Sequence, residues 1–159
     1  MVDILLLQTV SILVTSAGLL IAALYYVLQI RHQTKMRQTD LVMRLYTTFG
    51  SKEYLEAYTN VRTMEFKDYN DFEEKYGWTD VSLIGVFFEG VGVLLHRELI
   101  DIELVDDLFT GPTKIIWNKI RQLVEVTREK ASYPQLYEWF EYLYNELQKR
   151  EQQLASKTA

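Results

Sequence analysis

The chain has 159 residues, of which 7 are glycine, 2 are proline and none is cysteine, and its formal charge is −5. This length predicts one domain with accessory segments. The absence of cysteine excludes disulfides, thiolate catalysis and cysteine-based metal sites. The charge is unevenly distributed, since residues 31–44 carry a net +3 and residues 45–159 a net −7. Such an acidic body argues against nucleic acid as a partner, because phosphate binding needs clustered cations.

Residues 4–30 contain no charged side chain. A helix of this length is about 40 Å long at about 1.5 Å per residue, whereas the hydrocarbon core of a membrane is about 30 Å thick. We therefore predict a single transmembrane helix over residues 1–30. A cleavable signal peptide is the alternative. It is disfavoured because the apolar run is too long and Asp3 stands where such peptides carry basic residues.

Basic residues follow the apolar segment directly, and no Lys or Arg precedes it. We expect Arg31, Lys35 and Arg37 to contact lipid head groups. By the positive-inside rule, the N-terminus lies outside and residues 31–159 are cytoplasmic. The expected location is the cell membrane, with a single pass through the bilayer.

The small and polar residues of the apolar segment recur at alternating spacings of three and four. In lipid, small residues permit close helix approach and polar ones bond across the contact. Three interpretations stand beside one another: chance, assembly with itself or another membrane protein, and a pore of several copies lined by these residues. This stripe, named the seam below, consists of Gln8, Ser11, Thr15, Gly18, Ala22, Tyr25 and Gln29.

The remainder of the chain shows helical spacing of apolar residues and no sustained alternation of period two. The predicted fold class is all-α, with the N-terminal transmembrane helix continuing into a cytoplasmic bundle of about four to five helices. A basic juxtamembrane helix is expected over residues 31–50, with Gly50 as its left-handed cap. The bundle domain follows over residues 51–148, and residues 149–159 form a polar tail that frays.

Two prolines set the expected breaks within the bundle. Thr110, Gly111 and Pro112 are predicted to end a short helix over residues 102–109, with Pro112 in the first turn of the next one. Pro134 is predicted to open the last helix.

Residues 81–95 form the most apolar part of the cytoplasmic region. Our first interpretation is a buried core helix, in which Gly85, Gly90 and Gly92 allow neighbours to approach closely. A second span is the alternative, but it needs about 20 apolar residues. A re-entrant or interfacial helix remains a further alternative.

Glu89 is the most informative polar residue, because a carboxylate among apolar side chains must find a partner or take up a proton. We predict a buried ion pair of Glu89 with one of Arg62, Arg121 and Arg128. The alternative is an acid–base or metal site with His96, seven residues away. The spacings typical of di-iron bundles and zinc hydrolases are missing. We therefore expect no catalytic residue, no metal, no cofactor and no enzymatic activity.

The order of the parts resembles an uncharacterised prokaryotic family of single-span helical membrane proteins, of the DUF4760 type. Two stretches carry this resemblance: FFEGVGVLLHRELIDIELVDDLF at residues 87–109, and IIWNKIRQLVEVTRE at residues 115–129. The resemblance implies the architecture and no substrate. We expect an interaction or scaffold protein, with membrane lipids, itself or another membrane protein as partners, that self-associates or serves a larger membrane complex. A homo-oligomeric pore lined by the seam is the alternative.

Overall fold

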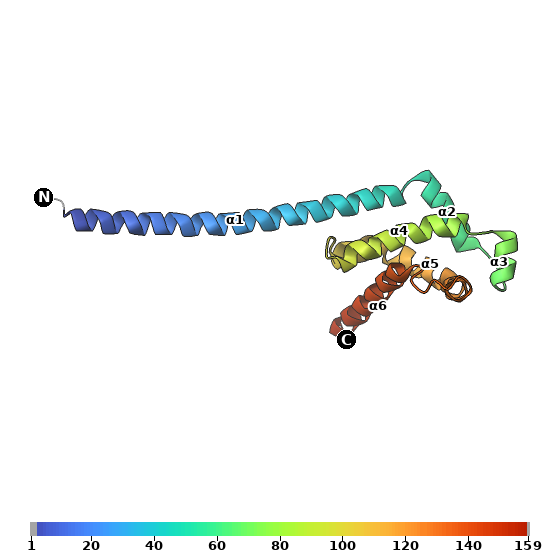
Figure 1. Cartoon of the computed structure of the whole chain (residues 1–159). Helices are drawn as coiled ribbons and strands as arrows, with labels where there is room; N and C mark the ends of the chain where they lie inside the picture. Colours follow the sequence, from blue (N-terminus) through green and yellow to red (C-terminus); the bar gives the residue numbers. More distant parts are fainter. Residues whose placement is uncertain (1–2, 159) are drawn as a thin grey trace. The chain divides into compact units, whose positions relative to one another are not determined.

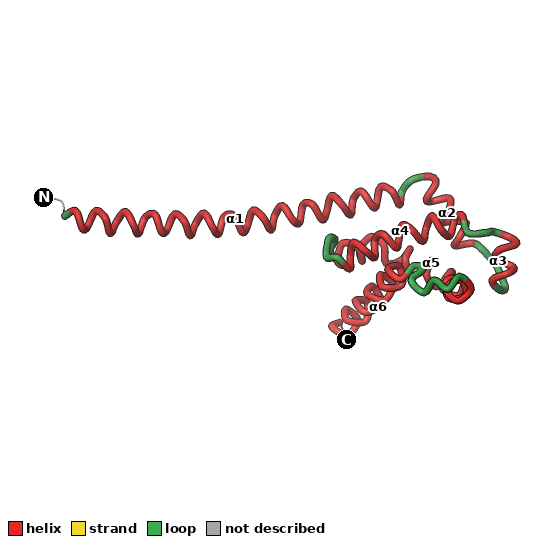
Figure 2. Tube along the Cα trace, viewed as in Figure 1, coloured by secondary structure: helices red, strands yellow, loops and turns green. Residues whose placement is uncertain are grey.

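The computed structural model describes residues 3–158, and every regular element among them is a helix (Figures 1 and 2). This confirms the predicted all-α class, with a long apolar N-terminal helix followed by a helical bundle. Met1 and Val2 of the predicted transmembrane segment, and Ala159 of the predicted tail, lie outside the described residues. The helices are α1 (Ile4–Phe49), α2 (Lys52–Thr63), α3 (Tyr69–Lys75), α4 (Thr79–His96), α5 (Ile102–Lys130) and α6 (Glu138–Thr158).

The chain divides into two compact units within α1, Met1–Gln38 and Thr39–Ala159. In the first unit, every side chain from residue 3 to residue 37 is exposed. The last turns of α1 belong to the second unit, where Val42 is buried.

The second unit is built around α4, which packs against α6, α2 and α5. The side chains of Ile84, Phe88 and Val91 point inward and are fully buried. The rings of Phe88 and Phe140 stack with their centroids 4.7 Å apart, which joins α4 to α6. This packing supports the interpretation of residues 81–95 as a core helix.

An aromatic cluster joins the end of α1 to the bundle. The ring of Phe49 lies 5.0 to 5.9 Å from four others, between ring centroids. These four are Tyr54 and Tyr58 of α2, Phe87 of α4 and Phe109 of α5. Aromatic pairs at these separations stabilise a fold beyond the area they bury, so the cluster fixes residues 39–49 against the rest of the second unit.

The turn after α1 differs from the prediction. Gly50 does not adopt a left-handed conformation; among the described glycines only Gly77, after α3, has a positive φ, of 68°. The Gly50 N–H instead donates to the Tyr46 carbonyl at 2.9 Å, which continues the helical pattern. Ser51 then caps α2 by accepting a bond from the Tyr54 N–H. The extended Ser51 makes the turn, so no left-handed residue is needed.

The predicted break at Thr110 to Pro112 was wrong, because α5 runs without interruption from Ile102 to Lys130. A proline within a helix costs about 3 kcal/mol through its missing N–H and a steric clash. The inward side chains on either side of it, Phe109 and Thr113 among them, form one buried stripe. Packing of this stripe on the core outweighs the local cost.

The last helix begins at Glu138 rather than at Pro134, since Tyr137 has a φ of 54° and cannot belong to a right-handed helix. The helix then continues to Thr158, so the expected fraying after residue 148 was also wrong. Ion pairs attach this polar stretch to α5. They join Arg150 to Asp106 at 2.9 Å and Glu151 to Lys114 at 2.6 Å.

Candidate functional site

The seam lies on the exposed helix of the first unit. All seven of its residues are exposed, and the helical repeat places them along one stripe. The Thr15 hydroxyl donates to the Ser11 carbonyl at 2.8 Å, so its hydrogen is used within the helix and its oxygen can still accept. A Cβ added at Gly18 would meet nothing within 4 Å, which leaves room there for another helix.

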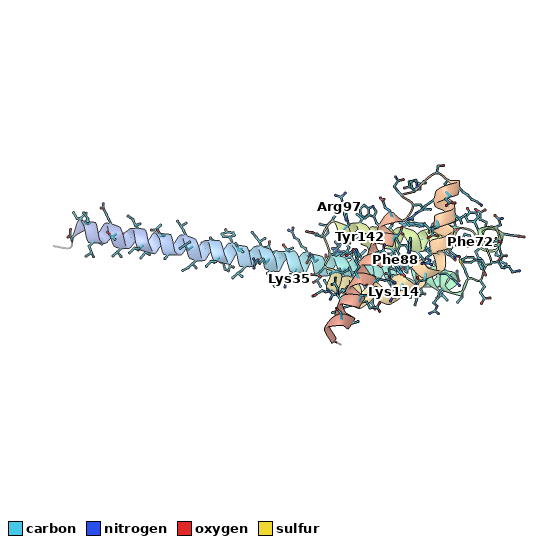
Figure 3. The ribbon with its side chains drawn as sticks, turned by 90° about the horizontal axis from the view of Figure 1, so that it is seen from below. Lys35, Phe72, Phe88, Arg97, Lys114 and Tyr142 are labelled. Carbon is cyan, nitrogen blue, oxygen red and sulfur yellow. The ribbon has the colours of Figure 1, made fainter. Side chains whose placement is uncertain are left out.

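Basic side chains follow this helix segment at once. Arg31, Lys35 and Arg37 are exposed, and Lys35 is marked in Figure 3. Arg31 and Lys35 are four residues apart, so they share one face of α1. Farther along, Arg44 pairs with Asp40 at 3.0 Å, on a strongly exposed part of the helix. The segment over residues 4–30 is therefore bounded by cations on its C-terminal side.

A second site is the place where α6 begins against α4, which we name the α4–α6 junction. Gly85, Glu89 and Gly92 recur there at spacings of four and three and so share one face of α4. A Cβ at Gly85 would overlap the ring of Tyr137, and one at Gly92 would overlap the carbonyl of Trp139. The two glycines thus permit the close approach that the sequence predicted.

Glu89 uses this close approach to cap α6. The Phe140 N–H donates to Glu89 Oε2 at 2.8 Å. The first N–H groups of a helix have no partner within it, and a carboxylate also favours the positive end of the helix dipole. Burial raises the pKa of the Glu89 carboxyl, and the backbone bonds from Phe140 and Trp139 act in the opposite direction.

The predicted ion pair of Glu89 with an arginine is absent from the described residues. Arg62 and Arg121 are exposed on their helices. Arg128 donates to Glu141 at 2.8 Å and, through Nε, to a main-chain carbonyl at 2.9 Å. The start of α6 supplies donors and positive potential together, and the charge of Arg128 favours the Glu89 carboxylate in the same direction.

A family model described as a domain of unknown function (DUF4760) matches residues 12–147. The chain belongs to the DUF4760 family. No curated protein and no solved structure matches it. The DUF4760 match confirms the resemblance seen in residues 87–109 and 115–129, and it extends over both units of the chain.

In this DUF4760 protein, Glu89 and His96 contact different partners. His96 does not meet Glu89; its ring lies 4.3 Å from Trp139 and 5.3 Å from Tyr142, between centroids. Within residues 3–158, no group of three or more His, Asp or Glu side chains could hold a metal ion.

A polar hollow of about 360 Å³ lies between α2, α3 and the start of α4. Its polar groups bind one another. Asn60 donates to Asp80 at 2.8 Å, and the Tyr76 hydroxyl bonds the backbone of Glu65. Lys75 is held by Asp71 at 2.9 Å. The Asn60–Asp80 contact joins α2 to α4, and the Tyr76–Glu65 contact joins the segments on either side of α3.

The sequence did not reveal the cap that Glu89 places on α6 in the DUF4760 fold. Its partner is a backbone group 51 residues away, and no side-chain pattern marks such a donor. The available signal was the spacing of Gly85, Glu89 and Gly92, which predicts a single face of α4 that a neighbour approaches closely.

Proposed function

We propose that this protein is a non-enzymatic, membrane-anchored helical interaction protein, acting as a scaffold or as an accessory subunit of a larger membrane complex. The observation that carries the proposal is the helix over residues 4–30, which has no charge and no buried side chain. Leu20 and Ile21, for example, are each 68% exposed. Burying one such side chain is worth about 1.5–3 kcal/mol, so a segment of this kind is stable only in lipid or against a partner.

A bilayer is the medium that fits this segment best. A helix satisfies all its backbone groups internally, which lipid requires. Tyr25 and Tyr26 stand at the end where interfacial aromatic residues are favoured, and Arg31 and Lys35 follow within reach of anionic head groups. By the same charge asymmetry, the N-terminus lies outside and residues 31–159 in the cytoplasm of a cell membrane.

Membrane anchoring is tested by alkaline carbonate extraction of membranes that contain the full chain. We expect the protein to stay in the pellet and to enter solution only with detergent. Recovery in the carbonate supernatant would overturn the anchor. The full chain with an N-terminus intact by mass spectrometry distinguishes an anchor from a cleaved signal peptide.

Orientation is tested separately, because the chain has no cysteine of its own. Single variants Asp3→Cys and Lys52→Cys are treated with a maleimide that does not cross membranes, before and after the cells are opened. We expect Asp3→Cys to react on intact cells and Lys52→Cys to react only after opening. The reverse pattern would overturn the orientation and leave the anchor intact.

We propose that the seam assembles copies of the chain or docks it on another membrane protein. The masses of Gly18→Ile and Thr15→Leu in mild detergent are compared by light scattering with those of the wild type and of Leu20→Ile, on the opposite face. We expect smaller assemblies for the two seam variants only, and unchanged masses in both would overturn self-assembly through the seam. A steady conductance in liposomes, lost in Thr15→Leu, would favour the pore.

A further inference from the structure

The outer face of α4 is apolar and uncharged over most of its length. Leu83 is 46% and Val86 67% exposed, and Gly90 is exposed on the same side. The α4 outer face, as we name it, consists of Thr79, Leu83, Val86, Gly90, Val93 and Arg97.

Gly90 makes no close contact with the described residues of its own chain outside α4. A Cβ added there would meet nothing within 4 Å, whereas Gly85 and Gly92 lie directly against α6. Glycine within a helix costs about 1 kcal/mol relative to alanine. The cost is offset at Gly85 and Gly92 by the contacts of the α4–α6 junction, and at Gly90 by none that the described residues make. A small residue on an exposed apolar face makes room for a partner from outside the chain.

The spacing of this face is the same when it is read in either direction. Its members follow one another at intervals of four, three, four, three and four residues. When two copies of α4 lie antiparallel with their midpoints at position 88, Val86 of each copy meets Gly90 of the other. Leu83 likewise meets Val93, and Thr79 meets Arg97. The bulk of Val86 fits the space left at Gly90, so the face is complementary to itself, as a two-fold interface requires.

We propose that the α4 outer face binds the same face of a second copy of this chain, with the two α4 helices antiparallel. Arg97 of one copy, marked at the end of α4 in Figure 3, then approaches the first turn of the other copy, which contains Asp80. This contact pairs opposite charges, and antiparallel helix dipoles also attract. Residues 45–159 as a whole carry a net −7, so two copies repel one another wherever such a pairing of opposite charges is missing.

The same charges disfavour a lipid surface as the occupant of this face. Helices that lie on membranes carry Lys and Arg along their polar side, whereas α4 has Asp80 and Glu89 and, within its bounds, neither Lys nor Arg. A single helix face is smaller than the ~1,200–2,000 Å² of a stable independent interface. The pairing therefore rests on the proposed anchoring, which holds the copies in one membrane and raises their effective concentration.

The test uses full-length chains in membranes and single cysteines in an otherwise cysteine-free protein. Val86→Cys and Gly90→Cys chains carrying different tags are produced together and oxidised mildly. We expect a disulfide between the two different chains, because the antiparallel arrangement brings position 86 of one copy beside position 90 of the other. Leu83→Cys with Val93→Cys is the second expected pair. Lys52→Cys with Gly90→Cys is the matched control, which we expect to stay uncrosslinked.

The outcomes separate this proposal from the anchor. Chains in the carbonate pellet without either expected disulfide would overturn α4 pairing and leave membrane anchoring standing. A disulfide from Gly90→Cys to an unrelated protein, in place of the two expected pairs, would overturn the second copy as the occupant. Chains in the carbonate supernatant would overturn the anchor, and oxidation of the purified mixture at high concentration then shows whether the faces still pair. Val86→Glu should abolish the Leu83–Val93 crosslink, whereas Val86→Thr should keep it.

Discussion

Two helices of this protein, α1 and α4, are both long and apolar enough to cross a membrane, but they differ in how much of their apolar surface is buried. In the most apolar 18-residue stretch of α1 no residue is buried, whereas 39% of the corresponding stretch of α4 is buried. Core helices of soluble proteins and signal sequences pass the same test of length and composition. Composition alone therefore does not distinguish a core helix from a membrane-spanning one. The difference lies in whether the chain itself supplies neighbours.

The glycines of α1 and α4 also differ in what surrounds them. Gly85 and Gly92 of α4 touch Tyr137 and Trp139, so their lack of a side chain is used within the fold. Gly18 of α1 meets nothing within 4 Å. In α4 the close approach is made within the fold, whereas at Gly18 we propose that a second helix makes it.

The largest effect is expected from placing charges in the middle of the exposed segment. In Leu13→Arg/Leu20→Arg, each arginine costs about 2.5–3.5 kcal/mol at the centre of a span, so the pair weakens insertion by about 5–7 kcal/mol. We expect the chain to move to the carbonate supernatant. Leu55→Arg, at an exposed site on α2, is the control that should stay in the pellet. If the double variant stayed in the carbonate pellet, the result would contradict the proposal that α1, unlike α4, lies in the membrane.

The next effect concerns the core side of the comparison. Phe88→Ala removes a fully buried ring that stacks on Phe140, and we expect it to lower the free energy of unfolding by about 3–5 kcal/mol. Leu20→Ala in α1 should leave the unfolding of the bundle unchanged. Denaturant titration of the full chain in detergent, followed by tryptophan fluorescence, measures both. Equal losses in the two variants would contradict the division into a self-sufficient bundle and a separate apolar helix.

These two helices also show what the sequence can predict. The apolar runs at residues 4–30 and 81–95, and the absence of alternating patterns, were enough for the all-α class. The ends of the helices were harder to predict. Pro112 is a local signal for a helix break, but the packing of the continuous buried stripe of α5 outweighs it. The partner of Glu89 was inaccessible, since any helix start can supply backbone donors and no residue type identifies which one does. The role of the seam stays a prediction, because the chain alone does not contain the partner that we propose for it.

Glycine substitutions in α4 have a smaller expected effect on the free energy of unfolding, and its sign differs between Gly92 and Gly90. Gly92→Ala forces a Cβ onto the Trp139 carbonyl, and backbone cannot move aside as a flexible side chain can. We expect the free energy of unfolding to fall by about 1–3 kcal/mol. Gly90→Ala meets no atom and gains helix propensity, so it should raise that free energy by up to about 1 kcal/mol.

Thermal unfolding of both glycine variants in the same detergent compares them directly, with Gly18→Ala as the control that should not change the bundle. Destabilisation by Gly90→Ala of the monomeric chain would show that position 90 has a contact within its own copy. That result would remove the reason for assigning Gly90 to an interface.

The smallest effect tests the cap at the α4–α6 junction through its pH dependence. Burial raises the pKa of Glu89 above its ordinary value of 4.5, so the folded protein holds the proton more strongly than the unfolded chain does. The contribution of Glu89 to stability is therefore most favourable below pH 4.5 and declines as the pH rises through the raised pKa.

Glutamine does not titrate, and its carbonyl can still accept the bond from Phe140. We expect Glu89→Gln to unfold with less dependence on pH, and its stability relative to the wild type to grow from acid toward neutral pH. Glu125→Gln, at an exposed site on α5, is the matched control. Equal pH profiles for Glu89→Gln and the wild type would contradict a Glu89 carboxyl whose pKa is raised by burial at the α4–α6 junction.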